Sequence, residues 1–183
     1  MFSEKGQTLI ELVVVVGIAA IVVGALVFAT VASLRNAQFS KNQSQATKLA
    51  QEGIERVRSA RDRNQEIKNL GDVYSWNGDA NGVRSIWSYE VYKKCFSSDS
   101  GSACYFKFDV NGSLSLLGIY STFPVALSES IPPLPAIGIF HRAIVLADDS
   151  SSYTTQKTVT VIVEWTDFSG PHQSKLTTIL GRK

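Results

Sequence analysis

One feature constrains this chain more than any other: an uncharged apolar run, Leu12 to Leu34, follows directly after a carboxylate, Glu11. About 20 residues at a rise of 1.5 Å each span roughly 30 Å, the thickness of the hydrocarbon core of a bilayer. The run is therefore long enough to cross a membrane as a helix. It is too long for the apolar part of an ordinary secretory signal, and the piece before Gln7, "MFSEKG", is short and polar.

The charges around the run predict its orientation only weakly. Lys5 lies before it, and Arg35, Lys41 and Lys48 lie after it, so a simple count of cations keeps the C-terminal part inside. Long domains cross a membrane largely regardless of flanking charge, and the two cysteines favour an oxidising compartment. We therefore expect the C-terminal part to lie outside the cytoplasmic membrane.

The residues around Gly6 have the order of a known processing signal. Lys5-Gly6, then "QTLIE" ending at Glu11, then an unbroken apolar helix, resembles the processing signal of type IV prepilins and of the pseudopilins of type II secretion. The resemblance implies a leader peptide at residues 1–6, cleavage between Gly6 and Gln7 by a membrane prepilin peptidase, and N-methylation of Gln7. The first mature residue is most often Phe in that family, and Gln7 departs from this pattern.

Glu11 requires a partner if it enters lipid. A bare carboxylate in hydrocarbon costs at least a few kcal/mol, and acids found there are usually paired and functional. The resemblance implies that the partner is the free amine of Gln7 on a neighbouring subunit, so that Glu11 acts in assembly. A simpler alternative stays open, because Thr8 and Glu11 also fit the Ser/Thr-x-x-Glu capping box at a helix start.

Small residues recur along the run at helical spacing. Ala20 and Gly24, followed by Ala25, Ala29 and Ser33, form small-xxx-small pairs, which let helix backbones approach closely in lipid. We expect Ala20 and Gly24 to be packing contacts in a helical bundle. The alternative is that Gly and Ala are simply common in membrane helices.

We expect the helix to continue past the membrane half, residues 7–34, as an amphipathic helix over residues 35–70. Its apolar residues recur every three to four positions and make one stripe. They are Ala46, Leu49, Ala50, Ile54, Val57 and Ala60. On the other face, Glu52 with Arg56 and Arg58 with Asp62 lie four apart as favourable pairs. The apolar stripe is expected to pack on the core of the chain's own head.

The remaining residues, 71–183, predict an antiparallel β head and therefore an α+β fold of the type IV pilin kind. Strands are indicated by "RSIWSYEVYKKC", "CYFKFDV", "FHRAIVLA", "KTVTVIVEW" and "HQSKLTTIL". Asn111-Gly112 lies between two apolar runs, which is a strong hairpin signal. Three prolines make residues 128–138 an irregular loop. The last two strands resemble the C-terminal hairpin of PilV-like minor pilins.

Cys95 and Cys104 bracket a polar stretch between two expected strands, which favours a disulfide at the tip of a hairpin. Free thiols are the alternative; a metal site would need more ligands than the two histidines offer. "NGDANG", residues 77–82, resembles the opening of a calcium loop but lacks the acidic residue at its twelfth position, Ser88. We expect no metal and no cofactor.

We find no catalytic signature: no nucleophile elbow, no phosphate-binding glycine loop and no dinucleotide fingerprint. The net basic stretch 35–68 is better explained as a solvated helix face than as a DNA contact. We predict a structural subunit, a minor pilin or pseudopilin of a type IV pilus or a type II secretion-like filament, and not an enzyme.

The resemblance implies, as partners, prepilin peptidase, other pilin subunits, an inner-membrane platform protein and an assembly ATPase. Before assembly, membrane lipid is expected to surround the helix. The protein is expected in the cytoplasmic membrane, as a single-pass protein with its C-terminal domain outside, and then in a pilus or in a periplasmic or cell-surface filament. We predict no nucleic acid as a direct partner. The alternative is a single-pass membrane protein whose uncut helix tethers an extracytoplasmic binding domain.

Overall fold

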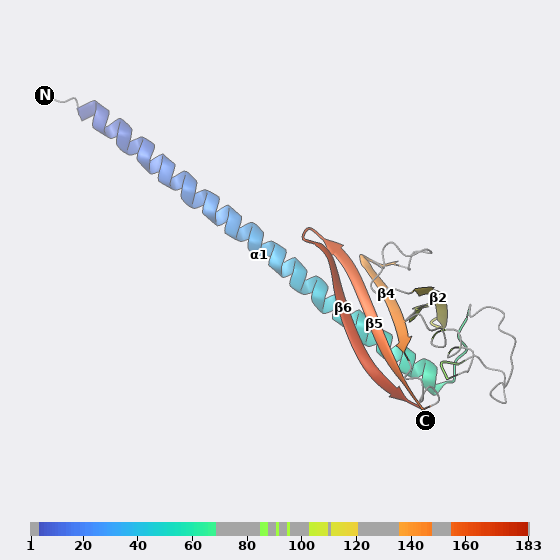
Figure 1. Ribbon diagram of the computed structural model, residues 1–183. Coiled ribbons are helices and arrows are strands. Elements are labelled where there is room, and N and C mark those ends of the chain that lie inside the picture. Colours follow the sequence, from blue (N-terminus) through green and yellow to red (C-terminus); the bar gives the residue numbers. More distant parts are fainter. Residues whose placement is uncertain are drawn as a thin grey trace. The chain divides into compact units, whose positions relative to one another are not determined.

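A computed structural model describes residues 4–68, 85–87, 91, 95, 103–109, 111–120, 136–147 and 155–182. These residues form a long helix and an antiparallel sheet (Figure 1). The elements are α1 (Glu4–Asp62), β1 (Ala103–Phe108), β2 (Leu114–Tyr120), β3 (Ala136–Ile137), β4 (Phe140–Ala147), β5 (Gln156–Asp167) and β6 (Gly170–Gly181). The chain forms two compact units, residues 1–42 and residues 43–183. This is the α+β, pilin-like fold that the sequence predicts.

The first unit is the N-terminal part of α1, and its apolar side chains are exposed. Among the described residues, one helical stretch is long and apolar enough to cross a membrane, with a mean hydropathy of 3.1 in its most apolar window and none of that window buried. Thr30 places a hydroxyl within this stretch, and that hydroxyl donates to the carbonyl of Leu26 at 2.7 Å. Its hydrogen bond is therefore satisfied within the helix, as a lipid environment requires.

The helix ends at Asp62, so the prediction that it extends to residue 70 was wrong. Asn64 has a left-handed φ of 48°. The Gln65 amide donates to the carbonyl of Ala60 at 2.9 Å, and the Asn64 amide donates to the carbonyl of Arg61 at 3.0 Å. These two bonds form a Schellman motif, in which Asn takes the left-handed position after the helix.

The strand order is β2-β1-β4-β5-β6, and β3 also pairs with β4. Figure 1 shows β4, β5 and β6 side by side as long strands. Their bounds agree with the predicted runs, and the C-terminal hairpin is confirmed. The loop expected over residues 128–138 needs one correction, because Ala136–Ile137 pairs with the first two residues of β4.

The predicted hairpin at Asn111-Gly112 is confirmed, since β1 and β2 are antiparallel neighbours. Gly112 has a φ of 76°, and its amide donates to the Asp109 carbonyl at 3.0 Å. The Asp109 carboxylate accepts from the amides of Asn111 and Ser113, at 3.0 and 2.8 Å. Lys68 Nζ lies 2.9 Å from its other oxygen. The turn is therefore closed by one carboxylate.

The predicted apolar stripe of α1 is confirmed, because five of its six residues belong to the core of the second unit and the sixth, Leu49, packs against that core. One face of β5 packs on the stripe through Val159, Val161, Val163 and Trp165. At Gly53 the helix and the sheet come so close that a Cβ would lie 2.8 Å from Val161 Cγ1. Gly53 thus lets the helix backbone contact the strand.

The prediction of a strand over "RSIWSYEVYKKC" was wrong for those residues of this run that the structure describes, 85–87, 91 and 95. Val91 and Cys95 are helical, and Ile86 and Trp87 lie in a turn. Trp87, Val91 and Cys95 are all buried, and their spacing of four is the helical period rather than the strand period of two. The rest of this run lies outside the described residues.

The predicted disulfide between Cys95 and Cys104 is confirmed, with a Cα–Cα distance of 5.2 Å. It does not lie at the tip of a hairpin. It joins a helical residue to β1, where Cys104 pairs with both β2 and β4. Both cysteines are fully buried, so the bridge fastens the segment that contains Cys95 to an interior strand of the sheet.

Candidate functional site

The N-terminal end of α1 contains every residue that the sequence predicts for processing. The helix begins at Glu4, so the Gly6–Gln7 peptide bond and Thr8 both lie inside it. Thr8 is therefore not at a helix start in the uncleaved chain, and the capping-box alternative does not apply to that form. Glu11 lies one turn further on with its side chain exposed.

The predicted packing positions lie further along the same helix. Ala20 and Gly24 are both exposed. A Cβ built on Gly24, like one built on Gly17, meets nothing within 4 Å. In the described part of the chain, this face of the helix is therefore open to a second helix.

Residues 1–27 match the family model of the prokaryotic N-terminal methylation motif. The chain carries the type IV prepilin signature. Comparison with curated proteins and with solved structures gives no match. This motif implies processing by prepilin peptidase and assembly with other pilins. Together with the pilin-like fold, it indicates a structural subunit rather than an enzyme.

The β5–β6 hairpin brings together a serine, a histidine and an aspartate, but not as a catalytic triad. Asp167 Oδ1 accepts from the Ser169 hydroxyl at 2.7 Å and lies 2.8 Å from His172 Nε2. Ser169 Oγ is 3.1 Å from the same Nε2. In a triad the serine and the aspartate contact opposite ring nitrogens. Here both contact one nitrogen, so the cluster closes a turn.

This turn is held by the same carboxylate chemistry as the β1–β2 turn. The hydroxyl of Ser169, followed by its amide, lowers the pKa of Asp167. His172 stacks on Trp165 with ring centroids 5.4 Å apart. Within the described residues no group of three or more His, Cys, Asp or Glu could hold a metal ion, and the predicted turn at residues 77–82 lies outside them.

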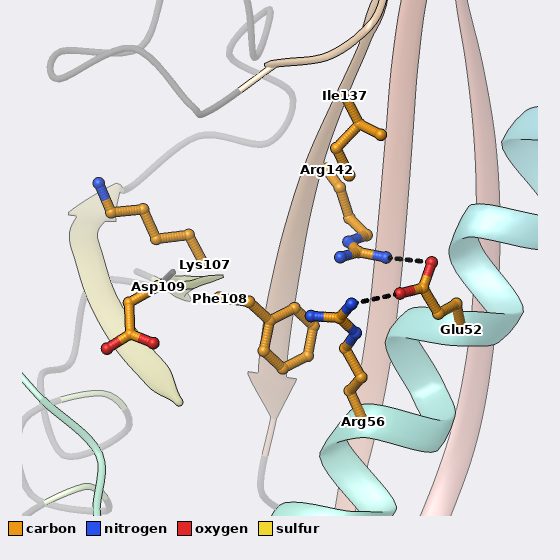
Figure 2. A pocket seen from close by; sticks show the side chains of 7 residues that line it. All are labelled: Glu52, Arg56, Lys107, Phe108, Asp109, Ile137 and Arg142. Atoms are coloured by element: carbon orange, nitrogen blue, oxygen red, sulfur yellow. Dashed lines mark ion pairs between the residues drawn. The ribbon is translucent and has the colours of Figure 1, made fainter. Parts of the chain in front are cut away.

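The head carries one pocket that the sequence did not predict (Figure 2). It has a volume of about 330 Å³ and is formed by α1, β1, β3 and β4. Its lining residues are Glu52, Arg56, Lys107, Phe108, Asp109, Ile137 and Arg142. All of them belong to the second unit.

Two guanidinium groups meet over one aromatic ring in this pocket. The guanidinium carbons of Arg142 and Arg56 lie 5.1 and 5.4 Å from the centroid of Phe108. Glu52 lies 2.6 Å from Arg56 and 3.4 Å from Arg142, as the dashed lines in Figure 2 show. Arg142 also donates to the Leu49 carbonyl at 3.0 Å. The pair Glu52–Arg56 was predicted; its extension to β4 was not. The predicted pair Arg58–Asp62 was wrong, because Arg58 pairs with Glu55 and Asp62 with Arg61.

Burial makes Arg142 the most constrained charge of the pocket. Its side chain is 7% exposed, and burial lowers the pKa of its guanidinium, which Glu52 partly reverses. An arginine stays protonated in spite of such a shift. The signal in the sequence was an arginine within a largely apolar strand, "FHRAIVLA". Its partners on α1 and β1 could not be read from spacing, since they come from distant segments.

Proposed function

We propose that this prepilin is cut between Gly6 and Gln7, methylated at Gln7 and assembled into a filament through its N-terminal helix. The methylation motif at residues 1–27 carries this proposal. The exposed apolar span supports it, because such a helix needs either lipid or other helices around it.

Glu11 supplies the specific contact in this proposal. Its carboxylate pairs with the new amine of Gln7 on the neighbouring subunit, so that the two opposite charges neutralise each other in the apolar environment. The open face at Ala20 and Gly24 lets the neighbouring helix approach closely enough for that contact. The leader occupies residues 1–6, the filament-core helix residues 7–34, and the head begins where α1 packs on the sheet.

The remaining partners are proposed from the same family. A cytoplasmic ATPase and an inner-membrane platform protein extract the subunit from the membrane, with the head outside. The sequence of the C-terminal β5–β6 hairpin, which resembles that of PilV-like minor pilins, favours a minor pilin or a pseudopilin over a major subunit. The disulfide also favours an oxidising location for the head.

Mass spectrometry of the mature N-terminus tests the proposal. The protein is purified from cells with and without prepilin peptidase. We expect methylated Gln7 at the N-terminus in the first case and intact Met1 in the second. An intact Met1 in both would show a membrane tether instead, and trimming that does not depend on the peptidase would contradict the proposed processing.

A further inference from the structure

We propose that the pocket of Figure 2 binds a carboxylate side chain from an acidic segment of a partner subunit, and that Glu52 holds this place in the free protein. The proposal deepens the proposed function and rests on it, because a filament subunit needs contacts on its head as well as along its helix. The occupant is thus an acidic polypeptide segment.

The first support is the balance of charge around the pocket. The described residues that line it include three cations and two carboxylates. Lys68, which lies outside the lining, pairs with Asp109, so Glu52 alone faces the three cations, which leaves two positive charges uncompensated among these residues. The lining cations are Arg56, Lys107 and Arg142, and the carboxylates are Glu52 and Asp109. Asp109 is already engaged by Lys68 and by the amides of its own turn. An additional carboxylate is therefore the complementary charge.

The second support is the way in which Glu52 is shared. A guanidinium carries five N–H donors in a planar fork that suits a carboxylate. Glu52 makes one close contact, 2.6 Å to Arg56, and one longer contact, 3.4 Å to Arg142. One carboxylate cannot saturate two guanidinium groups. Glu52 is also 43% exposed, so it can turn to solvent when another carboxylate enters.

The third support concerns the position of Arg142. Its contact with the Leu49 carbonyl and its stacking on Phe108 hold the guanidinium in place without Glu52. A charged group that is fixed before the ligand arrives loses little entropy on binding. The pocket is therefore preorganised for a carboxylate rather than assembled by it.

The surroundings of the pocket favour a polypeptide over a free small molecule. Ile137 lines the pocket and is 40% exposed, and Ile139, in the following turn, is 51% exposed. Arginine and aromatic anchors beside exposed apolar residues are typical of protein interfaces. A volume of about 330 Å³ is at the low end for small-molecule sites, which span roughly 300–1,000 Å³, and it suits one side chain.

The test uses the full-length, disulfide-bonded protein in phosphatidylcholine nanodiscs. Fluorescein-labelled hexaglutamate is the probe, hexaglutamine is the neutral probe, and fluorescence anisotropy at low ionic strength is the measurement. We expect salt-sensitive binding of hexaglutamate and none of hexaglutamine. Equal binding of both peptides, or binding of neither, would overturn the proposal.

Two pairs of variants separate the pocket from general attraction. Arg56→Gln is expected to weaken hexaglutamate binding about tenfold, because it removes a charge-assisted contact. Arg58→Gln is its matched control: Arg58 lies on the same helix and pairs with Glu55 at 2.6 Å, outside the pocket, and is expected to change binding less than about twofold. An equal loss in both variants would mean that the peptide merely follows net charge.

Glu52→Gln has the opposite expected sign. Without the resident carboxylate the two guanidinium groups are free for the probe, so binding becomes about threefold to tenfold tighter. Glu55→Gln, its matched control, leaves the affinity within about twofold. If Glu52→Gln binds no better than Glu55→Gln, then Glu52 is only a structural partner of Arg56 and Arg142, and the proposal fails.

Two further readouts close the test. Thermal melts of all four variants show that the head is folded. Free glutamate, added at the same carboxylate concentration as unlabelled hexaglutamate, must compete less well; equal competition would assign the pocket to small carboxylates instead. The N-terminus is analysed separately by mass spectrometry, so a failure of peptide binding does not contradict the proposed processing. Protein that binds the peptide but is not processed in the cell would contradict the proposed function and not the pocket.

Discussion

At the scale of single residues, Gly53 decides how closely α1 approaches the sheet. A Cβ at this position would lie 2.8 Å from one methyl of Val161 and 3.3 Å from the other. Glycine costs a helix interior roughly 0.5–1 kcal/mol relative to alanine. Its presence in the interior of α1, in the half that packs on the sheet, is therefore explained by the contact with β5 and not by helix formation.

Gly53→Ala should destabilise the head, although it improves helix propensity. Val161 is β-branched and stiff, and overpacking a core costs typically about 1–3 kcal/mol, which exceeds the gain. We expect a net loss of about 1–2 kcal/mol in the free energy of unfolding by urea titration. Gln51→Ala, at an exposed position of the same helix, should change stability by less than about 0.5 kcal/mol. A stabilised Gly53→Ala would mean that the helix can move away from β5 at little cost.

Asp109 gives a prediction for pH. The hydrogen bond from Lys68 is the largest cause that lowers its pKa, and the amides of Ser113 and Asn111 add to it. A lowered pKa in the folded state means that the stabilisation is complete above the unfolded value of about 3.9 and is lost as pH falls through the folded value.

The comparison of wild type with Asp109→Asn tests this sign. The wild type should have the higher Tm from pH 7 down to about pH 5, and the difference should shrink below about pH 4. Asp62→Asn is the control, because the Asp62 side chain is 41% exposed and its carboxylate lies 2.9 Å from Nε of its sequence neighbour Arg61 rather than closing a turn. A Tm difference for Asp109→Asn that stays constant down to pH 2 would contradict the ionic role of the carboxylate.

At the scale of elements, the sequence predicted the parts whose pattern is local. β4, β5 and β6 follow from apolar and β-branched runs of strand length. The apolar stripe of α1 follows from its period. The same reasoning failed around Val91, because aromatic residues suggested a strand while the buried positions repeat every four residues.

The helix end and the pocket mark the limit of such reasoning. Asn64 takes the left-handed position after α1, and the predicted boundary at residue 70 lies at the far end of the segment, from Asn64 on, in which the helical pattern fades. The pocket depends on Arg56, Phe108 and Arg142, which lie far apart in sequence and meet only through the order of the strands. The local sequence pattern of each segment does not predict that these three side chains come into contact.

The disulfide acts at the scale of elements, because it ties the helical residue Cys95 to the sheet. Closing a loop of this length stabilises a protein by about 2–3 kcal/mol. We expect the double variant Cys95→Ser, Cys104→Ser to lose at least that much, since both side chains are fully buried. Reduction of the wild type should lower its Tm to a similar extent and leave the variant unchanged. A variant as stable as the oxidised wild type would show that the bridge is dispensable.

At the scale of the whole molecule, the two units have different demands. Residues 43–183 bury their own core, whereas the apolar residues of the first unit are exposed and need lipid or other helices. Stability of the head and assembly of the helix are therefore separate properties. A substitution in the first unit should change assembly without unfolding the head.

Glu11→Gln tests this separation together with the proposed charge pair. The variant keeps nearly the same shape but lacks the charge that meets the Gln7 amine, so we expect normal cleavage and methylation, an unchanged Tm of the head and a loss of incorporation into filaments of at least about tenfold. Glu55→Gln is the matched control, because Glu55 is an exposed acid of the same helix that pairs with Arg58. Sheared filaments are quantified against membrane-bound subunit, and the N-terminus is determined by mass spectrometry. If Glu11→Gln enters filaments as well as Glu55→Gln, the carboxylate is not required for assembly, and the register between neighbouring helices must come from the small residues at Ala20 and Gly24.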